Sequence, residues 1–174
     1  MIMKLIDRKG VSLIELVVTV AILSVLASLI LPSAQLITKR TKELELRRSL
    51  RTMRTAIDDY YRAYQDAVYV SKTMPIPSAA DPKASGYPES LQVLVEGFDF
   101  GKVDGTKKRF LRRIPIDPFN PPAPGEEPKW GLKGYADDPD DDPKETPEEI
   151  DGGLFDVVSL SEETAIDGTK YNEW

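Results

Sequence analysis

A single glutamate at the head of a long apolar run constrains this chain more than any other feature of its sequence. The run extends from Leu16 to Leu31 without a charged residue, and Glu15 stands directly before it. A charged side chain at the centre of a bilayer costs about 2.5–3.5 kcal/mol on insertion scales. A carboxylate kept in such a position is therefore expected to have a function.

The apolar run has the length of a membrane-spanning helix. Residues 11–31 number 21, which makes an α-helix of about 31 Å and matches a hydrocarbon core of about 30 Å. Pro32 follows, and a kink is expected there because proline removes a helical hydrogen bond. Two alternatives are a secretory signal peptide, whose cleavage site should follow the run, and a plain single-pass anchor. A buried core helix is disfavoured, because no charged face interrupts the run.

The residues before the run form a processing motif. Lys9-Gly10-Val11-Ser12-Leu13-Ile14-Glu15 follows a short basic segment and resembles the amino-terminal signal of type IV pilins and pseudopilins. In that superfamily a prepilin peptidase removes a leader ending in glycine and methylates the new amino group. The resemblance implies removal of residues 1–10 by cleavage between Gly10 and Val11, N-methylation of Val11, and a role for Glu15 in assembly. The family usually has phenylalanine or methionine where Val11 stands.

Basic residues on both sides of the run give conflicting signals about its orientation. Three precede the run and five follow it between residues 39 and 48, so the positive-inside rule favours a cytoplasmic carboxy-terminal side. The peptidase of the resembled family is cytoplasmic, however, and Gly10 must face it. We therefore expect a single-pass inner-membrane protein with residues 11–32 as the membrane helix and the carboxy-terminal domain in the periplasm.

A second helical stretch is predicted from residue 33 to about residue 70. Its apolar residues recur at intervals of three and four, the spacing of one face of an α-helix. Charged residues, among them Arg47, Arg51 and Arg54, fall on the opposite face. We expect an amphipathic helix that packs on a sheet. The apolar positions are Leu46, Leu50, Met53, Ile57, Tyr60, Tyr64 and Val68.

The remaining residues, 71–174, are predicted to form a loop-rich domain with a small sheet. Ile114–Pro121 predicts a rigid turn, and the best strand candidates are Trp130–Tyr135 and Leu154–Leu160. Asp137–Glu149 contains three prolines and predicts a solvated acidic loop. The expected fold class is α+β, a long amino-terminal helix, transmembrane in its first half, packed on a small antiparallel sheet.

Composition narrows the function classes. The chain of 174 residues has a formal net charge of −6 and contains neither cysteine nor histidine. An acidic chain argues against nucleic-acid binding, which needs clustered positive charge. Histidine is the commonest general base in enzymes, and cysteine supplies thiols that act as nucleophiles or metal ligands. Both residue types are absent. We therefore expect no nucleic-acid partner and no enzyme activity.

Motifs in the second half of the chain point to one subfamily of the pilin-like proteins. Tyr87-Pro88, Phe110–Phe119 and Gly153–Ser159 look like motifs of the major pseudopilin of type II secretion systems. Phe119-Asn120-Pro121 replaces the Trp-Gly-Asn-Pro ending that this subfamily has at the second motif. The similarity covers most of the chain in outline.

The resemblance implies a pilin-like fold and subunits that assemble helically through their hydrophobic helices. The product would be a periplasmic pseudopilus that drives protein export, with further copies of the chain, minor pseudopilins and the inner-membrane secretion machinery as partners. Glu15 would compensate the amino group of Val11 on a neighbouring subunit, because burying opposite charges together costs less than burying either alone.

The same resemblance implies a calcium site in the loop after the final strand. Here the loop is Ser159–Gly168, in which the glycine and first aspartate of the family pattern are replaced. Glu162, Glu163 and Asp167 offer the hard oxygen ligands that calcium prefers. The alternative is that they are ordinary surface carboxylates.

Two other functions remain open. One is a type IV pilin or a minor, tip-located pseudopilin, which would share the processing motif. The other is a membrane-tethered periplasmic binding module that never polymerises. Self-association of the full-length chain would distinguish a filament protein from this binding module, which stays monomeric.

Overall fold

A computed structural model describes residues 10–75, 85–101 and 103–174, with the side chains of residues 29–34 excepted. Apart from Gly10, the predicted leader therefore lies outside the described residues. The chain divides into two compact units, residues 1–40 and 41–174.

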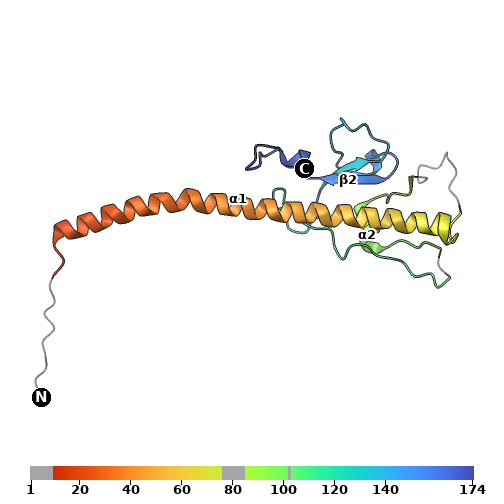
Figure 1. The fold of residues 1–174 in the computed structure, drawn as a ribbon, viewed down its shortest axis with the longest axis horizontal. Helices are drawn as coiled ribbons and strands as arrows, with labels where there is room; N and C mark the ends of the chain where they lie inside the picture. Colours follow the sequence, from red (N-terminus) through yellow and green to blue (C-terminus); the bar gives the residue numbers. More distant parts are fainter. Residues whose placement is uncertain (1–9, 76–84, 102) are drawn as a thin grey trace, which may run out of the picture. The chain divides into compact units, whose positions relative to one another are not determined.

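The longest element is helix α1, Leu13–Gln65, drawn from red to yellow in Figure 1. It continues through Pro32 and passes after Gln65 into a short π-helix, Asp66–Val70. The helical stretch therefore ends where the sequence predicts. The kink at Pro32 stays a prediction.

One face of α1 and of the π-helix after it forms part of the core of residues 41–174. All seven apolar positions predicted from their spacing, from Leu46 to Val68, are buried. They pack with Leu94 and with Leu132 and Leu154 of the sheet. Helical periodicity explains this agreement, because residues three and four apart share one face. The amphipathic helix predicted to pack on a sheet is confirmed.

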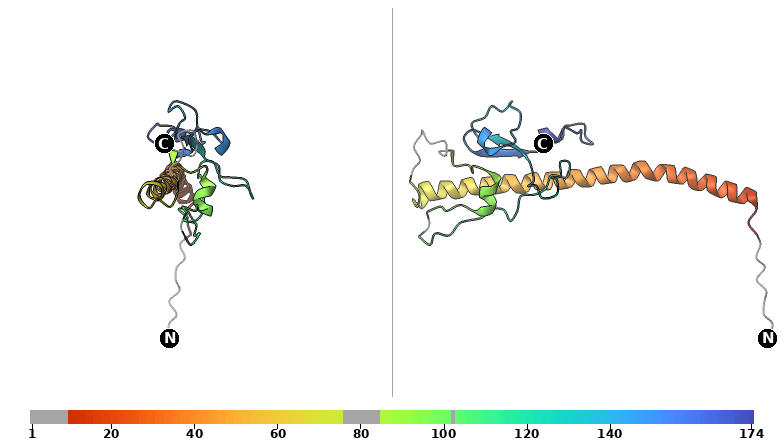
Figure 2. Two further views of the ribbon diagram at one scale, coloured as in Figure 1. Left: turned by 90° about the vertical axis from the view of Figure 1, so that its right-hand side faces the viewer. Right: turned by 180° about the vertical axis from the view of Figure 1, so that it is seen from behind.

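The sheet has two antiparallel strands, β1 (Gly131–Gly134) and β2 (Leu154–Val158). Gly131 pairs with Val158, and the register shifts between Lys133 and Gly134. Both strands lie within their predicted ranges, and the α+β fold is confirmed. A short helix, α2 (Leu91–Glu96), forms from an apolar segment. Figure 1 shows the hairpin above α1 and α2 below it. In both views of Figure 2 the hairpin and α2 are again apart.

The loop between the strands is acidic and mostly exposed, as predicted, but Asp137 is an exception with 8 % of its side chain exposed. Its carboxylate accepts hydrogen bonds from the Gly134 amide (2.6 Å), the Lys144 ammonium (2.7 Å) and the Asp151 amide (3.1 Å). Burial alone would raise the pKa of Asp137, but these hydrogen bonds outweigh burial and lower the pKa below its ordinary value. Asp137 thus fixes the base of the loop.

Replacing Asp137 by asparagine should destabilise the protein by about 1–2 kcal/mol at pH 7, because charge-assisted hydrogen bonds are lost. A carboxylate with a lowered folded-state pKa contributes stability above its unfolded pKa, and the contribution disappears as pH falls through the folded value. The difference from wild type should therefore be full at pH 7 and shrink below about pH 4. Urea unfolding of the detergent-solubilised chain measures it. Asp142→Asn, an exposed change in the same loop, should have little effect at any pH.

Candidate functional site

The first turn of α1 contains the glutamate that the sequence singles out. The helix begins at Leu13, and the carbonyl of Ser12 accepts its first hydrogen bond, from the Leu16 amide at 3.0 Å. Glu15 lies in this turn and is exposed. Amides without helical partners and the positive end of the helix dipole favour an anion there by about 0.3–1 kcal/mol. The carboxylate therefore lies at the end of the helix where an anion is favoured.

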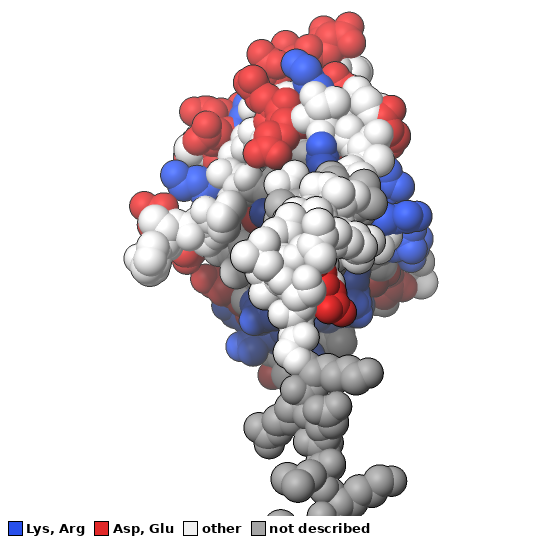
Figure 3. All heavy atoms as spheres, turned by 90° about the vertical axis from the view of Figure 1, so that its left-hand side faces the viewer, with Lys and Arg blue, Asp and Glu red and all other residues white. Residues whose placement is uncertain are grey.

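The helix surface that follows Glu15 is apolar and uncovered. Large apolar side chains from Val11 to Leu26 are all at least 49 % exposed, and Leu13 reaches 82 %. In Figure 3, which looks from the end where α1 begins, the described turns at the front form an almost uncharged white surface. A contiguous apolar surface of this size marks a site of contact with protein or lipid. Within the described residues, no helix combines the length and hydropathy of a membrane span.

The hydroxyl groups of this segment are hydrogen-bonded within the helix itself. Thr19, Ser24 and Ser28 each donate to a carbonyl three or four residues earlier, at 2.9, 2.8 and 2.7 Å. A hydroxyl without a partner would be costly to bury in apolar surroundings. Glu15 is therefore the one side chain between Gly10 and Ser28 that carries a charge and needs an external partner when the surface is covered.

The predicted cleavage position lies just before the helix. Gly10 and Val11 are exposed and outside regular structure. A Cβ atom added at Gly10 would meet nothing within 4 Å. Packing against the described residues therefore does not require glycine at this position.

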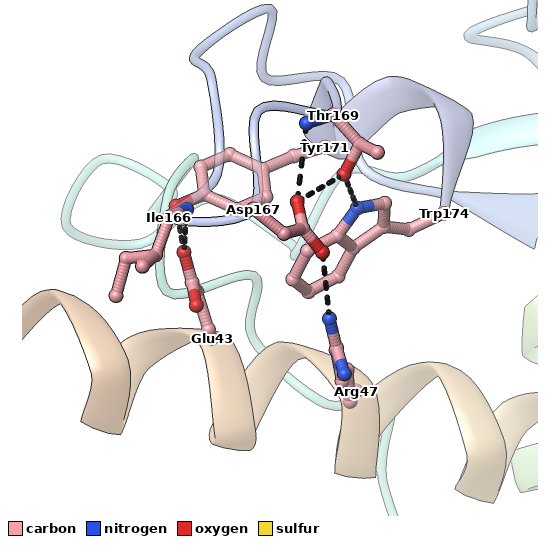
Figure 4. A network of polar contacts seen from close by, with 7 residues as sticks. All are labelled: Glu43, Arg47, Ile166, Asp167, Thr169, Tyr171 and Trp174. Carbon is pink, nitrogen blue, oxygen red and sulfur yellow. Dashed lines mark hydrogen bonds and ion pairs between the residues drawn. The ribbon is translucent and has the colours of Figure 1, made fainter.

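The carboxylates predicted to bind calcium do not converge. Asp167 accepts hydrogen bonds from the amide and hydroxyl of Thr169 (3.1 and 2.7 Å) and pairs with Arg47 at 3.4 Å (Figure 4). The Thr169 hydrogen bonds, with the charge of Arg47, lower the pKa of Asp167. Glu162 and Glu163 are exposed. Over the described ranges, no group of three or more carboxylates is placed to hold a metal ion, and calcium binding stays a prediction.

Glu43 is a buried residue with a structural role that the sequence analysis does not predict. Its side chain is buried, and Oε1 accepts hydrogen bonds from the Ile166 amide (2.8 Å) and the Tyr171 hydroxyl (2.9 Å), as Figure 4 shows. Burial, followed by the hydrogen bond to Glu43, raises the pKa of Tyr171. The burial of Glu43 could have been predicted from its position, because it lies three residues before Leu46 and therefore on the apolar face of the helix. Glu43 ties the carboxy-terminal segment to α1.

Arg54, which the sequence predicts on the face opposite the apolar positions, is partly buried. The side chain is 38 % exposed and forms an ion pair with Asp156 at 2.6 Å. It also donates to the carbonyls of Val157 (3.0 Å) and Trp174 (2.7 Å). Four hydrogen bonds, two of them to Asp156, hold this arginine beside β2. Arg47 and Arg51 remain exposed.

The comparisons with known proteins concern the amino-terminal segment. Residues 6–31 match the prokaryotic N-terminal methylation motif. The matched range contains Gly10, Val11 and Glu15, and it ends at Leu31, where the apolar run ends. No curated protein and no solved structure matches the chain. The methylation motif supports a place for this chain in the type IV pilin-like family.

Proposed function

We propose that this chain is a structural subunit, without catalytic activity, of a pilin-like filament. Its closest functional type is the major pseudopilin of a type II secretion system, whose filament drives protein export. The observation that carries the proposal is the exposed apolar surface of Val11–Leu26 with Glu15 as its one charge. Such a surface is unstable in water and is covered by lipid before assembly and by neighbouring helices after it.

In this proposal, Glu15 sets the register of assembly. Cleavage after Gly10 creates a new amino group on Val11, which the peptidase methylates and which stays cationic. The carboxylate of Glu15 on one subunit pairs with the amino group of Val11 on the next. Because the two contacting surfaces differ, the contact repeats without closing and produces a filament.

The proposed location is the inner membrane, with residues 11–32 as the single span and the carboxy-terminal domain in the periplasm. Further copies of the chain, minor pseudopilins, the secretion machinery and the prepilin peptidase are the proposed partners. Long filaments on the cell surface would instead indicate a type IV pilin. A full-length chain that stays monomeric would indicate a membrane-tethered binding module.

The first test is the intact mass and amino-terminal sequence of the chain recovered from the membrane fraction. We expect a chain that begins at Val11 and carries one methyl group. Gly10→Leu should remain uncleaved with an unchanged fold, since a Cβ atom at position 10 would meet nothing within 4 Å. Ser12→Ala, a change of similar exposure on the other side of the cleaved bond, should be processed normally.

Other amino termini would contradict the proposal. A wild-type chain that still begins at Met1 would be an ordinary anchored protein. A chain that begins after residue 27 or 34 would be a conventional secreted protein. In either case the filament function would have to be abandoned.

A further inference from the structure

A groove of about 1020 Å³ lies between α1 and the segment 110–116. Among the residues that line it, Leu44 and Ile116 leave 64 % and 53 % of their surface exposed. Glu45 is its one carboxylate, and its three cations are Arg48, Arg112 and Arg113. In the described parts of the chain, no carboxylate forms an ion pair with any of these arginines. The groove therefore has a positive charge and an apolar surface, both without a partner.

The fold holds one wall of this groove in place. The amides of Phe110 and Leu111 both donate to the carbonyl of Leu94 in α2, at 2.9 Å each. The Leu111 side chain is buried in the core. Arg112 and Arg113 follow directly and are exposed. Because the backbone before them is fixed, binding there requires little ordering beyond the two arginine side chains.

A complementary surface is present on the loop between β1 and β2. Asp140, Asp141 and Asp142 are consecutive and exposed, and among the described residues none of them has an ion-pair partner. A turn presents them, since the Asp141 amide donates to the Asp138 carbonyl (3.0 Å) and the Asp140 amide to the Asp138 carboxylate (3.1 Å). Asp137 anchors the base of this loop through the hydrogen bonds given above. The acidic turn is therefore also preorganised.

We propose that the acidic turn 138–142 of one copy docks into the arginine groove of the next copy, an inference that rests on the proposed filament function. In Figures 1 and 2 the loop between β1 and β2 projects from the hairpin away from α1, whereas α2 and its neighbouring segment lie elsewhere around α1. The acidic loop and the segment that lines the groove thus lie on different sides of α1. A head-to-tail contact between copies joins them, and such a contact extends a filament.

The chemistry of the two surfaces matches beyond the sign of their charges. Guanidinium groups bind carboxylates in a bidentate geometry that an ammonium cannot reproduce. Pro139 and Pro143 flank the three aspartates and supply apolar surface against Leu44 and Ile116. Charge pairing of this kind fixes the register of a contact and suppresses alternatives more than it raises affinity. The contact is thus suited to specify how periplasmic domains align once the apolar helices have associated.

The absence of cysteine from the natural chain allows a direct test by cross-linking. We expect the double variant Arg113→Cys/Asp141→Cys to form a ladder of disulfide-linked multimers when membranes containing the full-length chain are oxidised. Each single variant should stop at dimers. Arg51→Cys/Asp141→Cys is the matched control, because Arg51 is exposed on α1 but does not line the groove, and it should give no ladder.

Charge reversal tests the same contact without a cross-link. Arg112→Glu/Arg113→Glu and Asp140→Lys/Asp141→Lys should each reduce sedimentable polymer about tenfold or more, since like charges brought together at an interface cost several kcal/mol. The combination of all four changes should restore polymer toward the wild-type amount. Glu148→Lys/Glu149→Lys, an equal reversal of exposed carboxylates in the same loop, should leave the amount unchanged.

The outcomes separate this inference from the proposed function. If wild-type chains are unprocessed or never polymerise, the proposed function fails. If wild-type polymer forms but the Arg113–Asp141 ladder is absent and the four-residue combination does not restore assembly, the groove has a different occupant and this inference is overturned. Rescue together with the ladder establishes the acidic turn as the occupant.

Discussion

Replacing Glu15 by glutamine should abolish filament assembly while membrane insertion and cleavage proceed normally. Glutamine has nearly the same shape, so the apolar contacts of the helix remain. The amino group of Val11 on the neighbouring subunit would then be buried without a counter-charge, which costs about 3–5 kcal/mol when one partner of a buried pair is removed. Each 1.4 kcal/mol is a tenfold change in an association constant, so polymer should fall by about 100-fold or more.

Sedimentation and electron microscopy of membrane-extracted chains measure this loss. Glu148→Gln, the same chemical change at an exposed position of the carboxy-terminal domain, should assemble normally. Glu15→Val should insert at least as well as wild type and also fail to assemble. Normal filaments from Glu15→Gln would remove the charge pairing from the mechanism. A chain of this variant that retains its leader would place the role of Glu15 in recognition by the peptidase.

The second large effect is expected at Glu43. Glu43→Ala should lower the free energy of unfolding by about 2–4 kcal/mol, because the Ile166 amide and the buried Tyr171 hydroxyl both lose their acceptor. The loss should be local at first, with the carboxy-terminal segment leaving α1 before the core unfolds. Urea unfolding of the full-length chain in detergent and proteolysis of the segment after β2 measure the two effects.

Glu45→Ala provides the matched control, since Glu45 lies two residues away on the same helix and is exposed. Its effect on unfolding should stay within about 0.5 kcal/mol. Tyr171→Phe should lie between the two, because one of the two hydrogen bonds to Glu43 survives. Equal stability of Glu43→Ala and Glu45→Ala would show that the carboxy-terminal segment is held by its aromatic packing alone.

Features that local pattern determines could be predicted from the sequence. The seven positions predicted from intervals of three and four residues, from Leu46 to Val68, are all buried in the core. The ranges predicted for β1 and β2 contain both strands. The motif Gly10-Val11 with Glu15 identified the segment that matches the methylation motif. In each case, the residues that form the feature are neighbours in the sequence.

Features that depend on distant partners could not be predicted. The sequence predicts a rigid turn that contains Asp117, and the Asp117 carboxylate does accept a hydrogen bond from the Phe119 amide at 2.8 Å. The structure also buries Asp117 completely, with the Ser159 hydroxyl as a second donor at 2.6 Å from 42 residues away. Arg54 is likewise drawn inward by Asp156 at a separation of 102 residues. No local spacing encodes such a pairing.

In the proposed filament, the internal hydrogen bonds of Thr19, Ser24 and Ser28 bear on the transfer of a subunit from lipid into the filament. Because each hydroxyl keeps its partner within its own helix, moving the helix from lipid to a bundle of similar helices breaks none of these bonds. The apolar side chains meet surroundings of similar polarity on either side of that transfer. Under this proposal, we expect transfer out of the bilayer to change the free energy of residues 16–28 little. The free energy of transfer then depends mainly on the Val11 amino group and the Glu15 carboxylate.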